Sequence, residues 1–241
     1  MTLQFLPPPP GSTAPSDARL TRAADILDAL LAHRASRSDS VGAVVPTGIR
    51  ELDEPSGGLA LGTVTALIGP PGFRSTWLLL RAALHAAARE RPTLFCALDM
   101  TLASFAVGLA DVVTGPGGAG DAPSGTALRT AAAGLAELPL YVEVGTTIST
   151  HDIFAVAEDE LIDFVVIDNI RLLLPSGSAA DIKHCATDLN VAALASTTHP
   201  VSPHGVDLAG LEADLLSSAD TIASFDPTEQ SCRVVTTRTW P

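Results

Sequence analysis

The stretch from residue 63 to residue 90 constrains the fold more than any other part of the chain. An apolar, β-branched run, TVTALI, leads into the glycine- and proline-rich sequence GPPGFR and then into STWLLLRAALHAAARE, whose leucines and alanines recur with helical spacing. This order predicts a strand over 63–68, a turn, and a helix over 75–90. Because backbone N–H groups at such a helix start face outward, the unit is also a candidate phosphate site.

Strands and helices alternate along the rest of the chain from residue 41. This alternation predicts an α/β fold, with a mainly parallel, twisted sheet covered by helices on both faces. The run DFVVID at 163–168 is apolar and β-branched, which suits a buried central strand. Ligands in such sheets bind at the carboxyl ends of the strands. We expect further strands at 93–98, 140–144, 191–197, 220–226 and 232–238, helices at 101–113, 126–138, 149–160 and 179–190, and a flexible loop at 115–125.

The amino-terminal region differs in composition from this alternating part. Residues 1–16 are rich in proline, serine and threonine, which predicts a disordered tail. Within 17–40, the segment 17–34 places leucines and alanines on one helical face, so we expect a short helical arm followed by a polar linker. The arm either docks on another body or packs on its own domain. We therefore divide the chain into a tail, an arm at 17–40 and a main domain at 41–241.

Charge and cysteine usage exclude several classes of protein. The net charge of −13, with Lys183 as the single lysine, argues against a protein that coats nucleic acid, because such binding depends on cations that neutralise phosphates. Three scattered cysteines, an odd number without CxxC spacing, indicate reduced thiols and a cytoplasmic protein. No apolar run approaches the ~18 residues of a membrane span. The histidines fall on different elements, so we assign no zinc.

Residues 69–76 resemble the phosphate loop GxxxxGK[ST], with two departures. Gly69, Gly72 and Thr76 fit such a loop, and the Thr76 hydroxyl is a candidate Mg²⁺ ligand. Arg74 replaces the second motif glycine, and Ser75 replaces the lysine. If the loop is one residue shorter, Arg74 takes the place of the lysine and Ser75 that of the hydroxyl residue, although guanidinium is bulkier than an ammonium group. A glycine- and proline-rich turn with no ligand is the competing interpretation.

A second candidate site residue, Asp168, ends the apolar strand at 163–168. A carboxylate in this position can hold Mg²⁺ through water beside a phosphate loop. Many strands end on aspartate, so the residue alone is a weak signal. Its place about ninety residues after the glycine loop, with strands between them, strengthens it.

Six segments in order resemble the C-terminal ATPase domain of the DnaB-type hexameric replicative helicases, which has the RecA-like P-loop fold. The resemblance covers about residues 17–240. A recombinase-like or clock-type RecA relative, which would share the opening TGIRELDEPSGGL, fits the middle segments less well. The six segments are VPTGIRELDEPSGGLALGTVTALIGPPG (45–72), LFCALDMTLASFAVGL (94–109), LPLYVEVGTTISTHDI (138–153), FVVIDNIRLL (164–173), LNVAALASTT (189–198) and LLSSADTIASFD (215–226).

The resemblance implies roles for individual residues toward ATP and Mg²⁺. Asp168 would be the Mg²⁺-associated acid, and Asp99 stands where the family keeps a glutamate that orients the attacking water. Thr197 and Thr198 stand where a polar residue, usually glutamine, senses the γ-phosphate. Arg238 matches the arginine that reaches the nucleotide of a neighbouring subunit; a surface arginine is the alternative.

The departures from the family suggest that ATP and Mg²⁺ binding is weak or absent. Asp99 is one methylene shorter than glutamate, and the segment 199–218, where the family's loops grip DNA, contains no lysine or arginine. Single-strand grooves need positive charge and stacking aromatics, so we expect weak or absent DNA binding. In that segment His199 and His204 are either DNA contacts or solvated loop residues.

Two functions therefore remain open. The first is a DnaB-helicase-like nucleotide-binding protein, linked to DNA replication or maintenance, with weak or lost ATP hydrolysis. The second is a non-catalytic pseudo-ATPase that acts as a protein-interaction or regulatory module. In both cases we expect a homo-oligomer or a protein partner, because the helix matching 17–34 packs on the adjacent subunit in the family. We expect no membrane association.

Overall fold

The structure, a computed structural model, describes residues 44–70, 75–114, 124–145, 148–173, 179–198, 201–202, 205–206, 213–226 and 231–237. All of these ranges belong to a single unit that spans 42–241. The expectations for the tail at 1–16, for the arm at 17–40 and for most of the loop at 115–125 lie outside the described residues.

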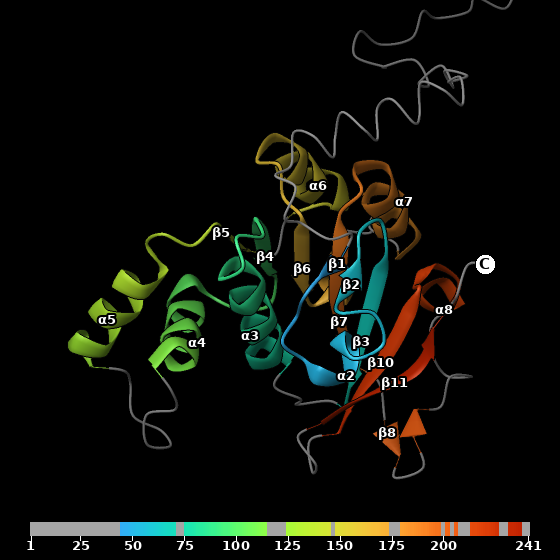
Figure 1. Ribbon diagram of the computed structural model, residues 1–241, viewed down its shortest axis with the longest axis horizontal. Helices are drawn as coiled ribbons and strands as arrows, with labels where there is room; N and C mark the ends of the chain where they lie inside the picture. The colour runs from blue at the N-terminus through green and yellow to red at the C-terminus, as the bar shows by residue number, and fades with distance from the viewer. Residues whose placement is uncertain are drawn as a thin grey trace, which may run out of the picture. The chain divides into compact units, whose positions relative to one another are not determined.

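A seven-stranded sheet forms the centre of the described part, in the order β11-β10-β3-β7-β6-β4-β5 (Figure 1). Neighbouring strands are parallel from β10 to β5, and β11 alone runs antiparallel, beside β10. The α/β fold with a mainly parallel sheet is therefore confirmed. The strands are β3 (Val64–Gly69), β4 (Thr93–Ala97), β5 (Leu140–Val144), β6 (Phe164–Asp168), β7 (Ala192–Thr198), β10 (Thr221–Asp226) and β11 (Ser231–Thr237).

Helices cover both faces of this sheet, because strand residues alternate between two apolar layers. Leu67, Phe95 and Val166 pack in one cluster with the buried side chains of α3 and with Phe105 of α4. Val165 and Ile167 pack on the opposite face against α6 and α7, and α8 covers the same face near β3 and β10. The helices are α3 (Ser75–Ala87), α4 (Leu102–Thr114), α5 (Gly125–Leu135), which packs on α4, α6 (Thr150–Asp159), α7 (Ala179–Leu189) and α8 (Ala213–Ser218).

The strand expected at 163–168 has the position that its composition indicates. β6 lies between β7 and β4, and all five of its residues are buried. The helix expected at 149–160 begins with a capping box, in which Ser149 Oγ accepts the backbone N–H of Asp152 while Asp152 accepts the N–H of Ser149. The helices expected at 75–90 and 126–138 end earlier than predicted, at Ala87 and Leu135.

Several short elements were not expected from the sequence, because two to six residues give periodicity too small a window. One of them, α2, follows a turn that Asp53 holds: its carboxylate accepts the N–H groups of Thr47 and Gly48, at 2.9 and 2.7 Å. Gly48 has φ +69°, and a Cβ there would lie 2.7 Å from the His85 ring, so no other residue fits. The unexpected elements are β1 (Val44–Val45), α2 (Arg50–Asp53), β2 (Leu59–Ala60), the 3₁₀ turn η1 (Ile170–Leu172), β8 (Val201–Ser202), β9 (Gly205–Val206) and α8.

Candidate functional site

The carboxyl ends of four adjacent strands, β3, β7, β6 and β4, lie side by side along one side of the sheet, which we call the carboxyl edge. Gly69, the last residue of β3, is level with Thr198, the last residue of β7. On the next strand, β6 ends at Asp168, which is level with Ala97 at the end of β4. Helix α3 begins at Ser75 on the same side, because it follows β3 through the 69–76 loop. This edge is where open parallel sheets bind ligands.

Asp168 is the centre of a hydroxyl cluster at this edge. Asp168 as a whole residue is only 1% exposed. Ser75 Oγ donates to Oδ1 at 3.0 Å, and Thr76 Oγ1 donates to Oδ2. A third hydroxyl, Ser196 Oγ, donates to Oδ1 at 2.5 Å. The fold thus joins the start of α3 to the end of β6, two segments that the sequence separates by 92 residues.

Ser196 is a site residue that the sequence reasoning missed. The resemblance points to Thr197 and Thr198, but side chains alternate along a strand. Ala193 and Ala195 of β7 belong to the apolar layer under α6 and α7, so Thr197 also points away from α3, whereas Ser196 and Thr198 point toward it. Because β6 and β7 pair with Ile167 opposite Ala195, Ser196 follows level with Asp168. That register is set by tertiary pairing and has no local sequence signal.

Asp99 lies two residues beyond β4 at the same edge and is exposed as a whole residue. Partial burial of its carboxyl group is the larger cause that raises the pKa of Asp99 above its usual value, and the negative charge of Asp168 is the second. Two carboxylates that repel each other in this way favour a cation between or beside them. The structure therefore places Asp99, Thr76 and Asp168 in one neighbourhood; their roles toward a ligand stay predictions.

The oxygen donors at this edge fit Mg²⁺. A carboxylate and a hydroxyl are hard oxygen ligands, which Mg²⁺ prefers over nitrogen and sulfur. Thr76 and Asp168 would hold the ion, as the sequence predicts. Among the residues that the structure describes, no three histidine, cysteine or acidic side chains gather as a metal cluster, so the fit depends on this hydroxyl and carboxylate pair.

The single lysine of the chain lies at the opposite ends of the strands, where they begin; we call this side the amino edge. Lys183 Nζ donates to the backbone oxygen of Gly62 at 2.9 Å and to Asp220 Oδ2 at 2.9 Å. Gly62 precedes β3 and Asp220 precedes β10, so both mark the amino ends of strands. The same Asp220 oxygen accepts the N–H of Val64 at 2.7 Å. Lys183 is therefore part of the strand starts and does not replace the missing lysine of the phosphate loop.

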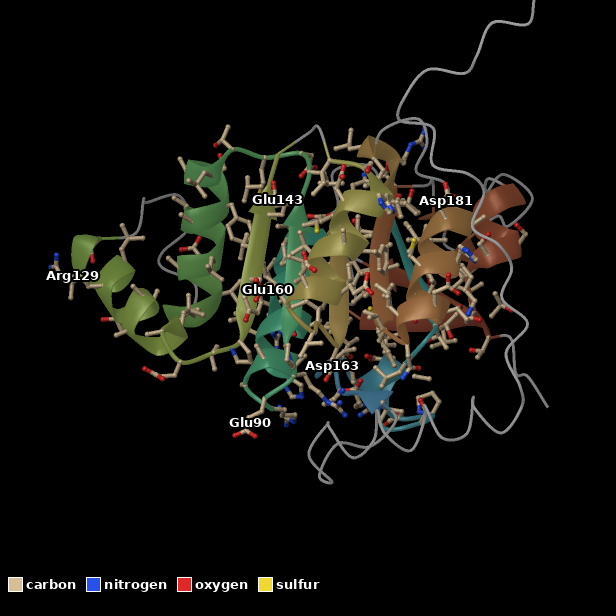
Figure 2. All side chains as sticks on the ribbon, turned by 90° about the horizontal axis from the view of Figure 1, so that it is seen from above. Glu90, Arg129, Glu143, Glu160, Asp163 and Asp181 are labelled. Atoms are coloured by element: carbon tan, nitrogen blue, oxygen red, sulfur yellow. The ribbon has the colours of Figure 1, made fainter. Side chains whose placement is uncertain are left out.

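A second ion pair, between Arg91 and Asp163, also lies at the amino edge. Arg91 Nη1 donates to Asp163 Oδ2 at 3.2 Å, and Nη2 donates to the backbone oxygen of Val44 at 2.7 Å; both charged side chains are buried. Figure 2 shows Asp163 and Glu90 at this end of the strands, with Glu143 toward the other end. Of the residues assigned to the nucleotide, Gly72 and Arg74 of the phosphate loop and Arg238, the candidate arginine finger, lie outside the described residues.

No protein-family profile and no curated protein sequence matches this chain. Among solved structures, the chain is similar to one described as an ATPase domain, with a TM-score of 0.69 and 16% identity over 90% of this chain and 92% of that one. The fold is RecA-like. A DnaB-like replicative helicase, whose structure was described with its interactions with primase, matches with a TM-score of 0.64 and 17% identity. That match covers 88% of this chain and 63% of the helicase chain, so our chain spans less than two thirds of it.

Two further findings concern the sequence expectations. In the part of the chain with described coordinates, no helix is both long and apolar enough to cross a membrane. Cys96, Cys185 and Cys232 carry free thiols, in agreement with the absence of CxxC spacing. Cys96 and Cys232 are buried and Cys185 is partly exposed.

Proposed function

We propose that this protein is a DnaB-helicase-like, RecA-fold nucleotide-binding protein, linked to DNA replication or maintenance, whose own ATP hydrolysis is weak or lost. The observation that carries the proposal is the junction of Ser75 and Thr76 with Asp168. This junction joins a phosphate-loop-like helix start to an acid at the end of a central strand. The likeness of the fold to an ATPase domain supports the same conclusion.

The residues of the carboxyl edge have distinct parts in this proposal. The start of α3 directs its first N–H groups toward an anion, and the helix dipole favours negative charge there. Thr76 and Asp168 hold Mg²⁺, which neutralises charge on the phosphates when it is bound. We assign the terminal phosphate to Thr198, which is level with Gly69 at the end of β7. Because Ser75 in the lysine position carries no charge, the neighbouring Arg74 supplies the cation that a lysine supplies in the consensus loop.

Weak hydrolysis follows from the acid at position 99. Asp99 reaches one methylene less far than glutamate, and a displacement of ~1 Å in a catalytic group can cost roughly 10²-fold in rate. An arginine finger contributes about 10³–10⁵ in rate to related reactions, and we assign this role to Arg238 acting on a neighbouring copy. The proposal thus expects nucleotide binding to exceed turnover by far. It includes a cytoplasmic location, a homo-oligomer or a protein partner, and weak or absent DNA binding.

Two observations favour the second candidate, a pseudo-ATPase that acts as an interaction or regulatory module. Asp168 is satisfied by three hydroxyl groups of its own chain, and the only lysine is committed to Gly62 and Asp220. A site that is satisfied internally needs no cation to be stable. The DnaB-like helicase above was described with primase, and a protein partner for this chain is the corresponding expectation.

Calorimetric titration of the full chain with ATP and Mg²⁺ tests the proposal. We expect measurable binding that Arg74→Ala abolishes and that the double change Arg74→Gly with Ser75→Lys strengthens. Arg89→Ala is the matched control, because Arg89 is an exposed arginine beyond the far end of α3 and bonds the backbone oxygen of His85. Absence of heat at millimolar ATP, both in the wild type and in the double variant, would reject nucleotide binding and leave the interaction module.

A further inference from the structure

The residue that stands in the lysine position turns toward the acid. Ser75 is the first residue of α3, and its Oγ donates to Asp168 Oδ1 at 3.0 Å. A lysine in this position of a consensus loop reaches the phosphates. In this chain the Ser75 hydroxyl instead donates a hydrogen bond to the Asp168 carboxylate, the group that would bind the cation.

The hydrogen bonds of Asp168 leave little room for a hydrated cation. An ionised carboxylate offers about four acceptor positions. Oδ1 accepts both Ser75 and Ser196, and Oδ2 accepts Thr76. Among the contacts of the described residues, one position therefore remains, on Oδ2 beside Thr76. Mg²⁺ keeps several of its waters when it binds to proteins, and each water that contacts the carboxylate needs an acceptor position.

The three hydroxyl groups are not equivalent in this respect. Ser196 lies on the buried strand β7 and is 1% exposed, so it is a fixed part of the sheet. Thr76 shares Oδ2 with the remaining position and is itself a candidate ligand. Ser75 is half-buried at the helix start and uses an Oδ1 position without contributing to the cation.

We infer that Ser75 is a built-in competitor of the divalent cation, because its hydroxyl occupies an acceptor position of Asp168 that the hydrated cation would use. A cation reaches the carboxylate fully only when the Ser75 hydroxyl leaves Oδ1. Neighbouring hydroxyls then have opposite effects: removing that of Ser75 strengthens cation binding, and removing that of Thr76 weakens it. The inference deepens the proposed function and rests on it, since the cation is the one that would accompany the nucleotide.

Mn²⁺ binding to the full chain without nucleotide tests this inference, measured by electron paramagnetic resonance. Mn²⁺ prefers the same oxygen ligands as Mg²⁺ and gives a direct signal for the free ion. We expect Ser75→Ala to bind Mn²⁺ about fivefold more tightly than the wild type, the equivalent of one ordinary hydrogen bond. Ser75→Thr keeps a hydroxyl and is expected to retain the wild-type affinity.

Further variants separate competition from a structural role of Ser75. Thr76→Ala is expected to weaken Mn²⁺ binding, and Ser104→Ala, which removes an exposed hydroxyl at the start of α4, to leave it unchanged. Ser75→Cys, whose thiol is a weak donor, gives a second variant with the same expected gain should Ser75→Ala fold poorly. If Ser75 is purely structural, its replacement lowers the thermal stability without raising the affinity for the ion.

The possible results separate this inference from the proposed function. Equal or weaker Mn²⁺ binding by Ser75→Ala and Ser75→Cys overturns the inference, as does absence of Mn²⁺ uptake by the wild type and both variants. Failure of the proposed function has another signature: titration with ATP gives no heat with or without metal, while the expected order of Mn²⁺ affinities among the variants persists.

Discussion

Replacing Lys183, the only lysine of the chain, tests whether this residue serves the starts of the strands or the nucleotide site at their carboxyl ends. Lys183 joins α7 to the starts of β3 and β10 through the backbone oxygen of Gly62 and Asp220 Oδ2, each at 2.9 Å. Lys183→Met keeps the length of the side chain and removes its charge and donors. If the lysine served phosphates, the change would abolish nucleotide binding; if it serves the fold, the change lowers stability only.

The expected loss of stability follows from the exposure of the pair. The side chains of Lys183 and Asp220 are 29% and 10% exposed, so the pair is neither a surface pair nor fully buried. Exposed pairs contribute about 0–1 kcal/mol, whereas breaking a buried pair costs about 3–5 kcal/mol. Asp220 still accepts the N–H of Val64 after the change. We therefore expect Lys183→Met to lower the free energy of unfolding by about 2 kcal/mol, which corresponds to ~4–8 °C in melting temperature for a domain of this size.

Thermal and urea unfolding, followed by circular dichroism, measure this loss. Lys183→Arg keeps the charge and is expected to lose less unfolding free energy than Lys183→Met. The matched control is Arg129→Met, which removes an exposed cation on α5 and is expected to leave the stability unchanged. ATP affinity is expected to be the same in Lys183→Met as in the wild type. Unchanged stability together with reduced ATP affinity would refute the assignment of Lys183 to the strand starts.

Two further predictions concern titratable groups. Hydrogen bonds from the Ser149 hydroxyl, and secondly from its backbone N–H, lower the pKa of Asp152. The part of the wild type's stability advantage over Ser149→Ala that depends on ionised Asp152 is therefore present above the ordinary aspartate pKa of about 3.9 and is lost as pH falls through the lower folded value. Urea unfolding at neutral and acid pH measures this difference in unfolding free energy, and a difference that grows in acid contradicts the cause. Burial raises the pKa of the Cys96 and Cys232 thiols to about 12, so a thiol reagent is expected to label Cys185 alone in the native protein, and equally fast native labelling of Cys96 would contradict this burial.

The long periodic segments of the sequence predict most of the fold. DFVVID is apolar through four consecutive positions, which identifies a central strand without knowledge of its neighbours. The order of strand, glycine loop and helix at 63–90 likewise identifies the unit that leads to Ser75 and Thr76. Both predictions use local information, since the pattern of one segment decides its structure.

The parts that the sequence does not predict depend on pairing between distant segments. The contact of Ser196 with Asp168 follows from the register of β6 against β7, and one residue of slip would replace it with another side chain. The position of Lys183 depends on how α7 packs over the strand starts. Short elements such as α2 depend on a single residue, Asp53, which holds the preceding turn.

A nucleotide bound beside Asp168, at the carboxyl ends of the strands, is the central expectation of the proposed function. Nuclear magnetic resonance of the isotopically labelled full chain with Mn²⁺ and ATP tests this location directly, because the paramagnetic ion broadens the amide signals nearest to it. We predict broadening at Gly69, Ser75 and Asn169, with the signals of Gly62 and Arg91 at the amino edge retained. Broadening centred on Gly62 and Arg91, or equal broadening along the whole chain, would contradict the account.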